Sequence, residues 1–148
     1  MKAVWAPVFL LLLVAPAMAA ELRRGNGGEP DSLDPAFAGT QWEVNIVGDL
    51  MVGLTTLDAV AKPIPGMAES WEVSKDGLTW KFHLRRAQWS DGTPVTASDF
   101  VFAFRRLVDP ATHSRYAANL WVLKNGATVS AGKLPPVWLG AAALSVVE

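Results

Sequence analysis

Residues 69–85 read ESWEVSKDGLTWKFHLR, and this stretch decides the local fold. Its centre is Asp76-Gly77, a dipeptide typical of tight turns between antiparallel strands. After the turn, four apolar side chains fall on one face: Leu78, Trp80, Phe82 and Leu84. The alternate positions are polar: Thr79, Lys81, His83 and Arg85. Because the side chains of a strand alternate between its two faces, the sequence predicts a β-hairpin with the apolar four buried.

An amphipathic helix is predicted after a second turn, which spans residues 89–94. Thr96 is a good N-cap residue, and Asp99 three positions later can act as its acidic partner. Apolar residues then recur at helical spacing: Phe100, Val101, Phe104, Leu107 and Val108. Pro110 is expected to end the helix because proline cannot continue its hydrogen-bond ladder.

Shorter elements are expected on both sides of these two. A helix is predicted over residues 43–52, and Gly53 can end it. The apolar face of this helix would comprise Val44, Val47, Leu50 and Met51. The remaining predictions are a strand over residues 54–57, an edge strand between Pro63 and Pro65, a short helix over residues 116–123 and a strand over residues 144–148.

The first residues have the pattern of a cleavable secretory signal peptide. Lys2 provides a positive charge, and an apolar run follows at residues 8–14. Ala17-Met18-Ala19 fits the small-residue cleavage step, so residues 1–19 are predicted to be removed. A membrane anchor, the alternative, would need about 20 consecutive apolar residues, and this run is about half that length. We therefore expect an exported mature chain at residues 20–148.

Cysteine content and charge narrow the classes of function. The chain has no cysteine, which excludes disulfides and thiolate catalysis, and it lacks the acylated cysteine that a bacterial lipoprotein carries after its apolar run. The formal net charge of −1 argues against nucleic acid as the main partner. Two histidines without cysteine argue against a metal site. No cofactor is expected.

The chain contains seven tryptophans, which is many for its length. Trp71, Trp80 and Trp89 resemble a binding stripe in spacing. The hairpin alternation instead favours positions in the core or at its edge for these three side chains.

Two polar groupings have alternative interpretations. Ser90, Asp91 and His83 have the residue types of a catalytic triad. They fall on a turn and on the polar face of a strand, so the required geometry has no support. Arg105-Arg106 is predicted to be a solvated helix face or part of an ion pair.

Several segments together resemble one known family. They are residues 29–35 (EPDSLDP), 66–71 (GMAESW), 76–85 (DGLTWKFHLR) and 89–100 (WSDGTPVTASDF). In this order they resemble the family 5 extracellular solute-binding proteins, the oligopeptide- and dipeptide-binding components of ABC importers. Residues 108–112 (VDPAT) and 131–136 (AGKLPP) resemble the oligopeptide-binding branch more specifically. Collinear motifs are far more specific than any single one.

The resemblance implies a fold and a set of partners. Family members are α/β proteins with two lobes joined by a hinge, of the type II-like periplasmic class. This chain would supply part of the first lobe, with a mixed sheet, a β-hairpin and flanking helices. Residues 20–148 would be the truncated N-terminal part of the family domain. The resemblance further implies a monomeric periplasmic receptor that captures oligopeptides and delivers them to the membrane permease subunits of an ABC importer.

The resemblance also implies ligand-binding residues. Tyr116 matches a position that faces the bound peptide, where its phenol would exchange hydrogen bonds with the peptide backbone. A core or surface tyrosine is the alternative. Gly39, Thr40 and Gln41 match the loop that approaches the peptide. Gly39 stands where well-known oligopeptide binders have an acidic residue.

Other functions remain open at this point. One is an exported hydrolase on an α/β scaffold, and another is a truncated product that binds nothing. Relatives also carry dipeptides, nickel complexes, haem or sugars. We expect the chain alone to bind peptides weakly or not at all, because a missing second lobe would leave half a cleft.

Overall fold

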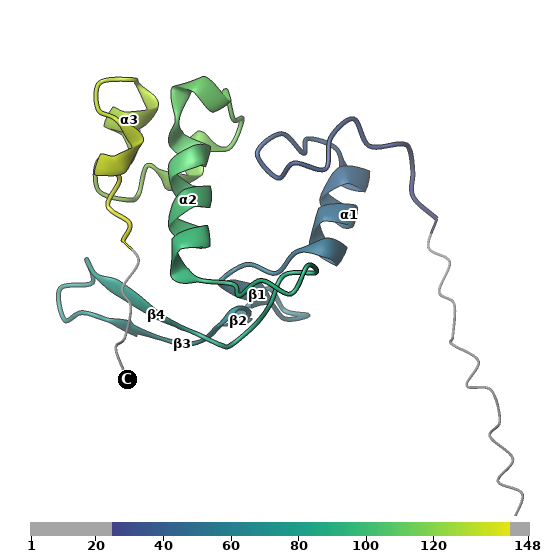
Figure 1. Ribbon diagram of the computed structural model, residues 1–148, viewed down its shortest axis with the longest axis horizontal. Helices are drawn as coiled ribbons and strands as arrows, with labels where there is room; N and C mark the ends of the chain where they lie inside the picture. Colours follow the sequence, from purple (N-terminus) through teal and green to yellow (C-terminus); the bar gives the residue numbers. More distant parts are fainter. Residues whose placement is uncertain (1–24, 143–148) are drawn as a thin grey trace, which may run out of the picture.

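A computed structural model of the chain describes residues 25–142 (Figure 1). The predicted signal peptide at residues 1–19 and the strand predicted over residues 144–148 lie outside the described residues. None of the helices described between residues 25 and 142 is long and apolar enough to cross a membrane.

The predicted hairpin is confirmed. Strand β3 (Ala68–Val73) pairs antiparallel with β4 (Trp80–Leu84), and Trp71 lies opposite Phe82 in the register. Gly77 has a φ of 72°, in the left-handed region that glycine adopts without a steric penalty. The connection between the strands is longer than a two-residue turn, and within it the Asp76 carboxylate accepts hydrogen bonds from the Leu78 N–H and the Ser74 hydroxyl.

The predicted burial of the hairpin's apolar face is wrong for two of its four residues. Leu78 is 83% exposed and Trp80 is 55% exposed, whereas Phe82 and Leu84 are half-buried. Leu78 lies in the turn rather than in the strand, and β3–β4 is a two-stranded sheet that offers little surface to pack against. Trp71 is half-buried, but Trp89 is 48% exposed, so the expected position in the core or at its edge is wrong for Trp80 and Trp89.

A second strand pair precedes the hairpin. Strand β1 (Thr55–Leu57) pairs antiparallel with β2 (Pro63–Pro65), as expected for a short strand and an edge strand. The α/β class is confirmed. Within residues 25–142 the strands form two separate antiparallel pairs rather than one mixed sheet. Short connections join each strand to the next, and such connections permit antiparallel pairing, whereas parallel pairing needs a longer crossover.

Helix α2 (Ala97–Val108) follows the prediction closely. Thr96 is its N-cap, and the Asp99 carboxylate accepts hydrogen bonds from the Thr96 N–H at 2.7 Å and the Thr96 hydroxyl at 3.1 Å. The helix ends at Val108, and Pro110 opens the 3₁₀ turn η1 (Pro110–Thr112). These contacts confirm Thr96, Asp99 and Pro110 as the residues that bound the helix.

The apolar core lies between α2 and the segments after it. Val108, Val129 and Leu139 are buried together, and Phe104 packs against them. The segments concerned are η2 (Ala117–Leu120), α3 (Gly126–Ser130) and η3 (Pro136–Trp138). Figure 1 shows α3 beside α2, above the two strands of the hairpin. The predicted helix over residues 116–123 is therefore a shorter 3₁₀ turn.

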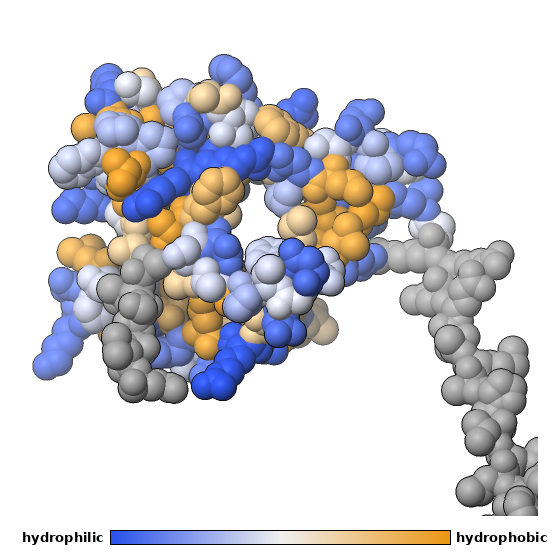
Figure 2. Space-filling view, in the orientation of Figure 1, coloured by the Kyte–Doolittle hydropathy of each residue, from blue (hydrophilic) through white to orange (hydrophobic). Residues whose placement is uncertain are grey.

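Helix α1 (Gln41–Leu50) begins and ends two residues before the predicted helix. Thr40 is its N-cap, and Met51, rather than Gly53, is its C-cap. Its apolar face is open to solvent, since Val44 is 48% and Leu50 65% exposed. Figure 2 shows apolar side chains gathered over this helix.

Candidate functional site

The carboxylate of Glu43 holds two loop segments together. Its Oε1 accepts hydrogen bonds from the backbone N–H groups of Asp31 at 3.0 Å and Ser32 at 3.1 Å. Its Oε2 accepts from Gly39 at 2.7 Å and Thr40 at 2.8 Å. Glu43 is only 3% exposed. A buried charge of this kind is tolerated because every one of these bonds favours the ionised carboxylate.

These hydrogen bonds also fix the protonation state of Glu43. The N–H groups of Gly39 and Thr40 lower the pKa of the Glu43 carboxyl from its usual 4.5 to about 2. The Thr40 hydroxyl oxygen lies 3.4 Å from the Glu43 backbone nitrogen, which closes a capping box at the start of α1. The Thr-x-x-Glu spacing was visible in the sequence and would have identified both the helix start and its acidic partner.

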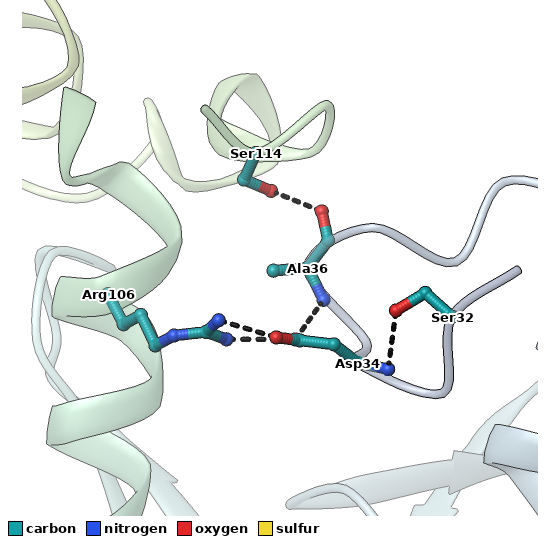
Figure 3. A network of polar contacts seen from close by, with 5 residues as sticks. All are labelled: Ser32, Asp34, Ala36, Arg106 and Ser114. Carbon is teal, nitrogen blue, oxygen red and sulfur yellow. Dashed lines mark hydrogen bonds and ion pairs between the residues drawn. The ribbon is translucent and has the colours of Figure 1, made fainter. Parts of the chain in front are cut away.

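An ion pair joins this loop to α2, 72 positions later in the sequence. The Arg106 guanidinium donates to the two carboxylate oxygens of Asp34 at 2.8 and 2.5 Å, as Figure 3 shows. Asp34 also accepts from the Ala36 N–H at 3.0 Å, and the Arg106 charge lies 5.9 Å from the ring centre of Phe37. The Arg106 hydrogen bond lowers the pKa of Asp34, and Asp34 raises the pKa of Arg106. The ion-pair interpretation is thus confirmed for Arg106.

Two hydroxyl groups complete the attachment. Ser114 donates to the Ala36 carbonyl at 2.9 Å (Figure 3), and Tyr116 donates to the Ala38 carbonyl. The Tyr116 N–H in turn donates to the Ser114 hydroxyl oxygen at 3.2 Å. We call this set of contacts the clasp: residues 31–40 held by Glu43, Arg106, Ser114 and Tyr116.

The clasp brings the four predicted ligand-binding residues into one neighbourhood. Tyr116 is half-buried and its hydroxyl reaches Ala38, the residue before Gly39. Thr40 is half-buried as the N-cap of α1, while Gly39 and Gln41 are exposed. The Gln41 side-chain amide donates to the Asn45 side chain at 3.0 Å. Contact between these four residues and a ligand stays a prediction.

The structure does not assemble the catalytic triad considered above. His83 Nε2 lies 2.9 Å from the Glu72 carboxylate on the hairpin surface. The Asp91 carboxylate accepts from the N–H and hydroxyl of Thr93 within its own turn. Each group is therefore engaged locally, and neither is aligned with Ser90.

Between residues 25 and 142, no three His, Asp or Glu side chains are placed to hold a metal ion. A shallow hollow of about 440 Å³ lies beside the second turn, and none of the predicted ligand residues lines it. Its lining comprises Arg86, Ala87, Gln88, Pro94 and Val95.

Comparisons with known proteins place the chain among solute-binding proteins. The family model "Bacterial extracellular solute-binding proteins, family 5 Middle" matches residues 62–139. The chain is 51% identical over 118 residues to the periplasmic oligopeptide-binding protein OppA of Haemophilus influenzae, across 78% of this chain and 22% of that protein. It is 43% identical over 127 residues to the periplasmic murein peptide-binding protein MppA of Escherichia coli. This match covers 84% of this chain and 24% of that protein.

The structural comparison agrees. The crystal structure of Haemophilus influenzae OppA in complex with the peptide RPPGFSPFR matches with a TM-score of 0.75 and 46% identity, covering 81% of this chain and 24% of that one. The chain spans less than a quarter of the length of these relatives. The family is a class of solute-binding proteins and not a class of enzymes. The resemblance seen in the motifs is confirmed, and the chain belongs to family 5 of the bacterial extracellular solute-binding proteins.

Proposed function

We propose that the chain is part of the substrate-binding component of an ABC importer and captures oligopeptides in the periplasm. The observation that carries this proposal is the hydrogen bond from the Tyr116 hydroxyl to the Ala38 carbonyl. It fixes an aromatic side chain beside the loop of Gly39, Thr40 and Gln41. The periplasmic oligopeptide- and murein peptide-binding relatives support the choice of ligand.

The hydrogen-bonding groups of Tyr116 and the Gly39–Gln41 loop suit a peptide backbone. The Tyr116 hydroxyl donates its proton to Ala38, but its oxygen keeps lone pairs that can accept a peptide N–H. The N–H groups of Gly39 and Thr40 are already bound to Glu43, so they are not free to bind a ligand. The loop would therefore contact a peptide through its carbonyl oxygens and side chains. Such contacts to the backbone hold peptides of varied sequence.

The proposal includes the route by which the protein works. Residues 1–19 would direct export and be removed, and the absence of cysteine argues against a lipid anchor. The mature protein would diffuse in the periplasm as a monomer, bind no nucleic acid, catalyse no reaction and deliver peptide to the permease subunits. N-terminal sequencing of the protein isolated from the cell envelope should begin at Ala20. A sequence that begins at Met1 would contradict the export step.

The binding proposal is tested by titrating the purified ¹⁵N-labelled chain with a mixed pool of tri- and tetrapeptides and following amide chemical shifts. The chain has less than a quarter of the relatives' length, so it would surround little of a ligand. Of the two outcomes that the sequence leaves open, weak binding and none, we propose weak binding, with an affinity of about millimolar order, some 4 kcal/mol. The shifts should be concentrated at Gly39–Gln41 and Tyr116.

A matched pair of variants distinguishes binding at this site from non-specific binding to exposed apolar residues. Tyr116→Phe keeps the ring but removes the hydroxyl, so it should weaken the shifts at the loop. Trp138→Phe changes a 61% exposed aromatic residue elsewhere and should leave them unchanged. Shifts spread over the exposed apolar residues, or no shifts at all, would contradict the proposed function of this chain.

A further inference from the structure

Arg115 lies between the two residues that anchor the loop. Its neighbours Ser114 and Tyr116 donate hydroxyl hydrogen bonds to the Ala36 and Ala38 carbonyls, so the Arg115 backbone is held close to the clasp. The Arg115 Nη1 atom lies 2.6 Å from the point that a Cβ on Gly39 would occupy. The guanidinium therefore rests over the loop in a position that is available because residue 39 has no side chain.

The charge of Arg115 is uncompensated in this neighbourhood. Glu43 already accepts backbone N–H groups on both oxygens, and the Asp34 carboxylate is paired with Arg106. Within the described part of the chain, residues 25–142, neither a hydrogen bond nor an ion pair involves the Arg115 side chain. Arg115 is also exposed to solvent. An arginine placed in this way presents its fork of N–H donors to whatever approaches the loop.

We propose that Arg115 is a specificity-determining residue that makes this site favour peptides carrying a carboxylate beside the loop. A planar guanidinium binds a carboxylate through two parallel charge-assisted hydrogen bonds, a geometry that a neutral amide does not reproduce. The inference rests on the proposed function, because it assigns a preference to the same site. The carboxylate can belong to an acidic side chain or to the C-terminus of the peptide, and the two sources are distinguished by experiment.

The test compares three peptides on the purified chain by NMR titration at low ionic strength. Ala-Glu-Ala-amide carries only a side-chain carboxylate, Ala-Gln-Ala with a free C-terminus carries only a terminal one, and Ala-Gln-Ala-amide carries neither. We expect one of the two carboxylate peptides to bind about two- to fivefold more tightly than the neutral one, the range measured for exposed ion pairs. The preference should shrink in 0.5 M salt because exposed charges are screened.

Two variants test whether Arg115 causes the preference. Arg115→Gln should make the affinities for the charged and neutral peptides equal, and Arg115→Lys should retain part of the difference. Gly39→Ala keeps the arginine but places a methyl group 2.6 Å from the present position of Nη1, so the guanidinium must move and the preference should also fall. Lys75→Gln removes an exposed charge from the hairpin turn and should leave the preference unchanged.

The outcomes separate the inference from the proposed function. Equal binding of all three peptides by the unsubstituted chain would overturn the inference and leave the proposed function standing. A preference that persists in Arg115→Gln would also overturn it. Absence of binding by every peptide would contradict the proposed function of this chain, and the inference would fail with it.

Discussion

The clasp and the β3–β4 hairpin are held together in opposite ways. The hairpin pairs residues that are close in sequence, through a regular backbone ladder closed by the Asp76-Gly77 turn. The clasp joins residues 34–38 to residues 106–116, across 72 to 78 positions, and its long-range contacts come from side chains. A loop without regular secondary structure can therefore be fixed by a few well-placed polar groups.

The two regions also differ in how far their stabilising groups are exposed to solvent. Much of the hairpin surface is exposed, and an isolated two-stranded sheet is marginally stable in water. The clasp is organised around the buried carboxylate of Glu43, whose backbone partners come from two sides of the loop. Hydrogen bonds to a charged acceptor are stronger than those between neutral groups. We therefore expect a single substitution to destabilise the clasp more than it destabilises the hairpin.

The substitution Glu43→Gln should produce the largest difference between the two regions. A glutamine amide has only one oxygen that can accept hydrogen bonds. Its NH₂ group would face backbone N–H donors that now donate to the second carboxylate oxygen. Amide exchange at Gly39 and Thr40 should accelerate about 10- to 100-fold, the usual range for a lost hydrogen bond to a charged group. Exchange in β3 and β4 should not change. The control is Glu69→Gln, an exposed residue on β3, and an equal effect from that variant would contradict the comparison.

Acid should open the clasp in a defined pH window. The pKa of Glu43 is lowered to about 2, so its contribution to the unfolding free energy is fully present above the usual carboxyl pKa of 4.5 and is lost as the pH falls toward 2. Urea unfolding at pH values across this window should show stability decreasing with acid. The decrease should be smaller in Glu43→Gln, and an unchanged slope in that variant would contradict the assignment.

A substitution in the hairpin turn should destabilise the hairpin and leave the clasp unchanged. Gly77→Ala forces a residue with a side chain to adopt a φ of 72°, which should cost the hairpin about 1 kcal/mol. The amides of β3 and β4 should exchange faster, whereas those of Gly39 and Thr40 should keep their protection. Faster exchange at Gly39 and Thr40 in this variant would show that the two regions are not independent.

The ion pair of the clasp should make the smallest contribution. The Asp34 side chain is 31% exposed and that of Arg106 is 37% exposed, so solvent screens their attraction. A double-mutant cycle with Asp34→Asn and Arg106→Gln should give a coupling of about 0.5 kcal/mol. A coupling indistinguishable from zero would mean that Ser114 and Tyr116 alone attach the loop to the segment after α2.

Local patterns predicted the local structure well. The alternation around Asp76-Gly77 identified the hairpin. Thr96, Asp99 and Pro110 correctly marked where α2 begins and ends. Burial was harder to predict, because period-two alternation shows which face a side chain occupies but not whether another layer covers that face. Leu78 and Trp80 illustrate this difference.

The clasp could be predicted only in part. The resemblance to the family placed Tyr116 and Gly39–Gln41 near a ligand, but no periodicity connects Tyr116 to Ala38 or Arg106 to Asp34. Such contacts depend on the tertiary path of the chain. Helix α3 was missed because Gly126–Ser130 is only five residues long, too short to show a periodic pattern. Asn125 stands at its N-cap, but its side chain makes no capping hydrogen bond.

The central claim is that the clasp holds the loop of Gly39–Gln41 in place before any ligand arrives. Residue-resolved hydrogen exchange of the ligand-free, unsubstituted chain tests it most directly. We predict that the amides of Asp31, Ser32, Gly39 and Thr40, which lie outside regular helices and strands, are protected at least as well as those of β3 and β4. Exchange of these four amides at the rates of an unstructured peptide would contradict the account.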